Sequence, residues 1–258
     1  MVTPAQPEDP PAAPPLISQV RVVRTRYEAG FGSDWHHNPT AQLIYPSRGT
    51  MTLHTRTGLW VVPPMRACWL PAFEDHKVTA STGFDMHSVY CEGVLLLRLP
   101  DRCGIVTVTA LLRELILALE HGEAARRTRH MALLFADEVR LEPAPQLFLP
   151  PLVTRRLQAI EAALARDPTD GRTIAQWASA LGTTSRSLAR AFEREAKMGF
   201  TAYRRQARLH AAIRKLADGE GVTSIAIDLG FGSASNFIKL FRESTGMTPK
   251  RYFDARGR

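Results

Sequence analysis

The sequence predicts an α+β fold of two domains: a β-barrel, linker helices, and then an all-α domain. Three observations support this prediction. Short apolar runs separated by turn residues fill 16–108, helical patterns and a Pro-rich stretch fill 109–151, and every segment of 152–258 has helical periodicity. With 258 residues, the chain is long enough to bury one core in each domain.

The first segment, 1–15, is rich in Pro and Ala and precedes the first apolar run. It lacks the basic start and apolar stretch of a secretion signal, so we expect a disordered tail. No apolar run in the sequence reaches the roughly 18 residues that a membrane helix needs. The three cysteines, Cys68, Cys91 and Cys103, are odd in number and form no CxxC motif. These features favour a cytoplasmic protein with reduced thiols and no membrane association, and none of the thiols is obviously reactive.

The barrel is predicted from apolar runs such as 41–46, 51–55, 59–62 and 67–70, which are separated by turn signals. This spacing is typical of an antiparallel barrel or sandwich. The segment 56–58 reads RTG and predicts a tight hairpin. Prolines near the strand ends can flank strands but cannot lie in the middle of a sheet.

The period then becomes helical. One predicted helix places five apolar residues on a single face: Leu111, Leu112, Leu115, Ile116 and Leu119. A second helix is predicted over 129–140, and four prolines in 142–151 mark a linker. The apolar face either forms a dimer seam or packs on the barrel, and the five residues alone do not decide between these.

Charge divides the chain unevenly. Residues 1–151 hold 14 basic and 15 acidic side chains, whereas residues 152–258 hold 19 and 10, a net charge of +9. A basic half can neutralise the phosphates of a nucleic acid, although it can also be an ordinary solvated surface.

The all-α half contains an internal repeat. Ala178 and Gly182 recur 48 positions later as Ala226 and Gly230. Five more residues recur with an offset of 49: Leu188, Ala191, Phe192, Met198 and Tyr203 match Phe237, Leu240, Phe241, Met247 and Tyr252. A Gly that ends a short helix allows a sharp turn, and the small Ala allows the next helix to approach closely. The repeat therefore predicts two helix-turn-helix motifs, at about 173–195 and 222–243.

In each motif the second helix has an apolar face and an opposite polar face. We expect the polar faces to read DNA bases or hold phosphates through Arg186, Ser187, Arg190, Ser235, Asn236 and Lys239. The helix that joins the motifs spans about 200–218 and is roughly 27 Å long, so it could set the reading helices about one DNA turn apart. The basic residues on it are candidate phosphate contacts: Arg204, Arg205, Arg208, Arg214 and Lys215.

The C-terminal half of the sequence resembles the AraC/XylS-type regulators. The resemblance covers about 152–258 and rests on Ala178, Gly182, Leu188 and Phe192, and on the segment AIDLGFGSASNFIKLFRESTGMTPKRYF at 226–253. It implies a transcription regulator that binds double-stranded promoter DNA, forms a homodimer and has RNA polymerase as a further partner. Lys197 departs from the pattern, because a Gly matching Gly246 would be expected there, and we expect a local backbone adjustment.

The first half resembles the small cupin barrel of some of these regulators, through WHHNPTAQLIYPSRG (35–49), GLWVVPPMRACWLP (58–71) and His76. At the positions of the cupin metal ligands it has His36, Asn38, Gln42 and His76, of which only two are strong ligands. His37 is a substitute only if the strand bulges, because adjacent strand residues point to opposite faces. The resemblance therefore implies no bound metal, cofactor or catalytic residue.

An effector site inside the barrel is the remaining expectation for this half. Aromatic and polar residues that could line it are His36, Gln42, Tyr45, Trp60, Trp69 and His76, although an ordinary barrel core can also contain them. The leading hypothesis is an effector-controlled, sequence-specific DNA-binding regulator. One alternative is a cupin-type metal-dependent enzyme with a helical basic tail, and another is a DNA-binding regulator whose barrel is purely structural.

Overall fold

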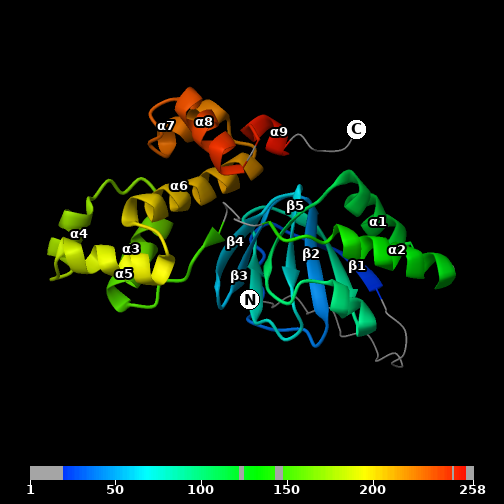
Figure 1. Cartoon of the computed structure of the whole chain (residues 1–258). Coiled ribbons are helices and arrows are strands. Elements are labelled where there is room, and N and C mark those ends of the chain that lie inside the picture. Colours follow the sequence, from blue (N-terminus) through cyan, green and yellow to red (C-terminus); the bar gives the residue numbers. More distant parts are fainter. Residues whose placement is uncertain (1–19, 122–124, 143–147, 246, 254–258) are drawn as a thin grey trace.

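The computed structural model describes residues 20–121, 125–142, 148–245 and 247–253. The N-terminal tail expected at 1–15 lies outside the described residues. Within them, a β-rich half is followed by an all-helical half, and the predicted fold class is confirmed (Figure 1). None of the described helices is long and apolar enough to span a membrane.

Two antiparallel sheets form the barrel. The larger sheet has the order β1 (Val20–Tyr27), β7 (Phe84–Cys91), β2 (Ala41–Arg48), β5 (Arg66–Leu70) and β8 (Gly104–Thr107). The smaller sheet has the order β6 (His76–Thr79), β3 (Met51–Thr55), β4 (Gly58–Val62) and β9 (Phe148–Leu149). The hairpin predicted at 56–58 joins β3 to β4, where Thr55 is paired with Gly58.

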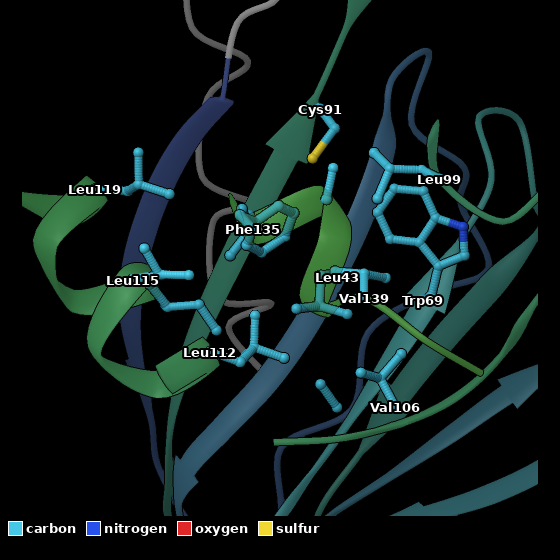
Figure 2. Close-up of a cluster of buried hydrophobic side chains, with 14 of the residues drawn as sticks. Leu43, Trp69, Cys91, Leu99, Val106, Leu112, Leu115, Leu119, Phe135 and Val139 are labelled. Carbon is cyan, nitrogen blue, oxygen red and sulfur yellow. The ribbon is translucent and has the colours of Figure 1, made fainter. Parts of the chain in front are cut away.

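Side chains alternate between the faces of each strand, so the larger sheet has a core on both sides. Ile44 and Cys68 belong to the core between the two sheets. Their neighbours Leu43 and Trp69 belong to a second core on the outer face of the larger sheet. A helical layer covers that face: η1 (Gly93–Arg98), α1 (Ala110–Glu120) and α2 (Ala125–Glu138). Figure 2 shows side chains of this layer lying over Leu43 and Trp69.

The apolar face of α1 packs on the barrel. Leu112, Leu115, Ile116 and Leu119 are buried in the outer core, whereas Leu111 is half exposed. Helix α2 starts four residues earlier than the predicted 129–140 and ends two residues earlier. The α1 stripe is therefore occupied within the chain, and only Leu111 is left for any other contact.

The Pro-rich linker contains a strand that the sequence did not predict. Phe148 and Leu149 form β9, which pairs with Trp60 and Leu59 at the edge of β4. The Phe148 ring lies 4.2 Å from the Trp60 ring, between their centroids. A Cβ atom at Gly58, where φ is +154°, would lie 2.2 Å from the Phe148 ring. Gly58 therefore leaves the space that the linker strand fills.

The second half consists of helices α3 (Arg155–Arg166), α4 (Ile174–Ala180), α5 (Ser185–Ala196), α6 (Phe200–Ala217), α7 (Val222–Asp228), α8 (Ala234–Thr245) and α9 (Pro249–Phe253). They build two cores rather than one. The first half of α6 contributes Phe200 and Tyr203 to the core of α3–α5, and its second half contributes Leu209 and Ile213 to the core of α7–α9. Helix α6 therefore connects two small helical units, as Figure 1 shows.

Candidate nucleic-acid interface and barrel interior

The first helix-turn-helix motif is formed by α4 and α5. Ala178 is 3% exposed, and Gly182 takes the left-handed conformation with φ +59°. The Thr184 side chain then accepts a hydrogen bond from the backbone N–H of Ser187, at 3.1 Å, and starts α5. A capping box between Thr173 and Gln176 starts α4 in a similar way.

The second motif repeats this geometry with α7 and α8. Ala226 is fully buried, and Gly230 has φ +69°. Ser233 takes the role of Thr184, because its side chain accepts a hydrogen bond from the N–H of Asn236 at 3.1 Å. Gly232, with φ +80°, provides the additional residue of this turn. The turn chemistry that the repeat predicts is present in both copies.

Helices α5 and α8 bury one face and expose the other. Leu188 and Phe192 are buried in the first motif, and Phe237 and Phe241 are buried in the second. All six predicted reading residues are exposed: Arg186, Ser187 and Arg190 on α5, and Ser235, Asn236 and Lys239 on α8. The structure thus groups them into two polar faces, one at the start of each second helix.

An open depression lies beside the second of these faces. It is lined by Ser235, Ile238, Lys239, Arg242, Glu243 and Thr248. Arg242 lies one turn after Ile238 on α8, and the sequence analysis did not select it. Its spacing of three from Lys239 was the available signal, because residues three apart share a helix face.

Three of the five basic residues on α6, namely Arg204, Arg208 and Lys215, have hydrogen-bond partners within the chain. Arg204 donates to the carbonyl of Arg172 at 3.0 Å, and Arg208 donates to the carbonyl of Pro168 at 2.9 Å. Lys215 lies 2.7 Å from a carboxylate oxygen of Glu220, which raises its pKa. Burial lowers the pKa of Arg214, and the nearby Asp218 opposes this effect.

The five residues therefore stay predicted phosphate contacts, and for three of them a phosphate would compete with a partner in the chain. Arg204 and Arg208 hold α6 against the segment between α3 and α4, and Lys215 pairs with Glu220 and Asp228. Arg205 is the one of the five that is exposed. The carbonyl partners of Arg204 and Arg208 lie 32 and 40 residues away in the chain, so a helical pattern does not reveal them.

Lys197 also differs from expectation. It takes the left-handed conformation directly, with φ +56° and ψ +22°, at the C-terminal end of α5. The backbone therefore keeps the geometry that a Gly would give, and Lys bears the steric cost. Gly246, its counterpart in the repeat, lies outside the described residues.

The barrel touches the second helical unit through the outer face of its smaller sheet. Val61 of β4 is fully buried in the core of α6–α9, and Leu59 packs beside it. The Arg66 guanidinium lies 5.9 Å from the centre of the Tyr252 ring of α9. Ser81 donates a hydrogen bond to Asp218 at 3.3 Å. Apolar and polar contacts together join the barrel to this unit.

The six residues proposed to line an effector site do not lie together. Tyr45 and Trp69 point out of the barrel and belong to the core under α1 and α2. The Trp69 indole N–H donates to the carbonyl of Pro100 at 2.7 Å, and the Tyr45 ring stacks on His87. The grouping of these two with the interior residues was wrong, because sequence alternation does not fix which face of β2 or β5 points inward.

The remaining polar residues lie near one end of the barrel. His36 and His76 pair through their backbones, and their ring centroids are 4.3 Å apart. Each ring has its Nδ1 atom near a backbone carbonyl, that of Asp34 at 3.0 Å and that of Glu74 at 2.9 Å. Burial lowers the pKa of His76 to about 4, so its imidazole is neutral near pH 7.

Gln42 and Asn38 are engaged with each other, since the Asn38 amide donates to the Gln42 carbonyl oxygen at 2.8 Å. His37 lies 3.2 Å from Asp75, and both side chains are partly exposed. Across the described ranges, no three His, Cys, Asp or Glu side chains are grouped as metal ligands. The polar groups available to a ligand at this end are the imidazoles of His36 and His76 and the amides of Asn38 and Gln42.

Trp60 is the one predicted aromatic residue that contributes to the core between the sheets. It is 5% exposed, and its indole N–H has no hydrogen-bond acceptor in the part of the chain that the structure describes. Because a buried N–H without a partner is costly, this atom is a candidate contact for a bound molecule.

Two protein families match the chain. The family described as a helix-turn-helix domain matches residues 177–255, and the family described as an AraC-like ligand binding domain matches residues 20–138. The HTH-type transcriptional regulator NimR of Escherichia coli K12 is 29% identical over 221 residues, which are 84% of this chain and 81% of NimR.

Two more distant similarities accompany these matches. The HTH-type transcriptional regulator RipA of Corynebacterium glutamicum is 30% identical over 122 residues, which are 47% of this chain and 35% of RipA. The crystal structure of ToxT from Vibrio cholerae O395 is 14% identical, with 93% of this chain and 99% of ToxT covered and a TM-score of 0.40.

Proposed function

Because this chain belongs to the AraC family of DNA-binding transcription regulators and carries an AraC-like ligand-binding domain, we propose that it reads two blocks of promoter DNA with α5 and α8. A small-molecule effector in the barrel would then change how the two helical units are held. The family consists of regulators and not enzymes, so the metal-dependent enzyme is no longer an alternative.

The observation that carries the proposal is the pair of exposed polar faces that follow the same turn. Arg186 and Arg190 on α5, and Asn236 and Lys239 on α8, are types that bind base edges or phosphates in a major groove. Helix α6 holds the two units on one rigid rod. Arg205 adds an exposed positive charge to that rod, suited to a phosphate contact.

Further parts of the proposal concern organisation and partners. We place the sensor barrel at 16–108, the linking segment at 109–151 and the DNA-binding domain at 152–258, with β9 donated by the linker to the barrel. A promoter-binding regulator of this kind would act in the cytoplasm as a homodimer and contact RNA polymerase. Since most of the α1 stripe packs on the barrel, a dimer surface would use the exposed side of the helical layer.

The effector would bind between the two sheets. His36, His76 and Gln42 at the barrel end supply polar contacts within an apolar surrounding, and so does the Trp60 N–H, which has no acceptor among the described residues. Such a molecule shifts DNA binding only if its affinity differs between two states of the protein. If no compound in a broad panel raises the melting temperature, a purely structural barrel is favoured instead.

Selection of bound sequences from a random DNA pool, at near-physiological salt, tests the DNA-binding proposal. We expect an enriched operator with two short blocks about one helical turn apart. On it, Arg186→Ala and Lys239→Ala should each weaken binding by about 1–3 kcal/mol if they contact bases, and each should relax one block only.

Arg48→Ala is a matched control, because Arg48 is an exposed arginine on the barrel. It should leave operator affinity unchanged. Equal weakening by Arg186→Ala on operator and random DNA would show that Arg186 touches phosphates only. Absence of any enriched sequence would contradict the double-reader proposal.

A further inference from the structure

Two of the three cysteines are in contact inside the barrel. Cys68 lies in the middle of β5, and Cys103 directly precedes β8. Their sulfur atoms are 3.8 Å apart, although 35 residues separate them in the chain. Strands β5 and β8 are antiparallel neighbours, with Cys68 opposite Ile105 and Trp69 opposite Gly104. A bond between the two sulfurs would therefore join adjacent strands of one sheet.

The two thiols differ in access to solvent. Cys68 is fully buried in the core between the sheets, whereas Cys103 packs against that core and is partly exposed. An oxidant from solvent can reach Cys103 first, and Cys68 then stands within contact distance behind it. Burial also raises the pKa of the Cys68 thiol well above its usual range, so that Cys68 is not the group that reacts first.

The third cysteine provides an internal comparison. Cys91 is fully buried in the outer core, under α1 and α2, on the opposite face of the same sheet. Burial raises its pKa too. Cys91 behaves as an ordinary small apolar residue. Cys68 and Cys103 differ from it because their sulfurs are in contact, both adjoin the core between the sheets, and Cys103 is reached by solvent.

We propose that Cys68 and Cys103 are a reversible thiol–disulfide site, oxidised by hydroperoxides. The Cys103 thiolate attacks the outer peroxide oxygen, the O–O bond breaks, and the departing alkoxide takes up the thiol proton, which leaves a sulfenic acid on Cys103. The Cys68 sulfur then attacks the Cys103 sulfur, and the hydroxyl leaves with the Cys68 proton as water. One hydroperoxide thus oxidises two thiols to one disulfide, with an alcohol and water as products.

The sulfurs must approach each other by roughly 1.8 Å to reach the disulfide bond length. Cys103 lies outside the regular strand, which begins at Gly104. Its backbone can therefore move without breaking a ladder hydrogen bond of β8. The required movement falls on the partly exposed Cys103 and not on Cys68 in the core.

The start of β8 is linked to the DNA-binding unit by a short series of contacts. The N–H of Glu142 donates to the carbonyl of Ile105 at 2.8 Å, and the Glu142 carboxylate lies 2.7 Å from the Arg66 guanidinium. That guanidinium faces the Tyr252 ring of α9. Displacement of Cys103 on oxidation would pull on the adjoining start of β8 and reach the second helical unit by this route, an effect that rests on the proposed function.

Peptide mapping under non-reducing conditions, after brief treatment with hydrogen peroxide, tests the site without any DNA. We expect the intact chain to lose about 2 Da, the Cys68 and Cys103 peptides to be joined, and dithiothreitol to reverse both changes. Cys103→Ser and Cys103→Ala should abolish the joined peptide, and Cys91→Ser should not. Three free thiols after treatment, or Cys103 found only as sulfinic or sulfonic acid, would overturn the proposal.

A second measurement concerns the link to the helical units. Operator affinity of the fully oxidised protein should differ from that of the reduced protein by about fivefold or more, and Cys103→Ser should remove this difference. Equal affinities would overturn the link. Because the mapping experiment needs no operator, its result is separate from any failure of the DNA-binding proposal.

Discussion

The first helix-turn-helix motif completes its core with α3, whereas the second completes its core with the barrel. Leu157, Ile160 and Leu164 of α3 pack on the first motif. In the second motif, the second half of α6 takes the place of α3, and Val61 of β4 enters the core beside it. The two motifs share their turns but not their neighbours.

This difference suggests a division of labour. The first motif carries its own support and meets the barrel through Leu149 of the linker strand. The second motif shares a core with the sensor sheet, so a change in that sheet alters its packing directly. We therefore expect the state of the barrel to affect the second reading face more than the first.

The largest expected effect comes from matched truncations in the two cores. Phe192 and Phe237 are both fully buried, and Phe192→Ala or Phe237→Ala should each cost about 3–5 kcal/mol of stability. Only Phe237→Ala should also speed hydrogen exchange of the β4 amides, because Val61 belongs to its core. Mass-spectrometric hydrogen exchange measures this, and equal effects on β4 would contradict the asymmetry.

A smaller effect is expected at Glu195, which exists only in the first motif, since the repeat has Ser244 there. Its carboxylate accepts hydrogen bonds from the N–H groups of Val153 and Thr154, at 2.8 and 2.9 Å. Burial opposes ionisation, but the bonds from Thr154, Val153 and Arg194 outweigh it and lower the pKa of Glu195 to about 2. The charged form therefore stabilises the start of α3.

Because the folded-state pKa lies below the unfolded value, this stabilisation is present above about pH 4.5 and is lost as the pH falls towards 2. Glu195→Gln should cost about 1.5–3 kcal/mol at pH 7 and flatten the loss of stability between pH 5 and 2. Urea unfolding at several pH values measures this. Glu193→Gln, an exposed neighbour, should change neither quantity.

The smallest expected effect is at Lys197, where a non-glycine residue has φ +56°. Lys197→Gly should stabilise the protein by roughly 0.5–1 kcal/mol, because Gly takes this conformation without strain. Lys197→Ala keeps the strain and serves as the control, with little change in stability. A gain from Ala equal to that from Gly, measured by urea unfolding, would show that charge and not backbone strain matters there.

The fold and the reading faces could be predicted from local signals. Gly182 and Gly230 marked the turns, and the apolar spacing of Leu188, Phe192, Phe237 and Phe241 fixed the opposite faces. Features that depend on distant partners could not. Strand β9 was hidden among prolines, and the contact of Cys68 with Cys103 depends on how β5 and β8 pair.

The direction in which barrel side chains point also could not be predicted from local signals. Alternation along β2 showed that Ile44 and Tyr45 lie on opposite faces, but both faces of this sheet are covered by apolar side chains. Apolar character therefore could not tell the interior from the outer layer. The role of Arg208 was equally hidden in the sequence, because it donates to a carbonyl about 40 residues away.

The two residues of β9 also restrict how such regulators can recombine during evolution. Adjacent strand residues point to opposite sides, so Phe148 enters the barrel while Leu149 enters the first helical core. A chimaera that joins this barrel to a foreign DNA-binding domain must keep Phe148, Leu149 and the glycine at position 58, which leaves room for the Phe148 ring. A junction shifted by one residue would exchange the two side chains, whereas a shift by two would preserve their alternation.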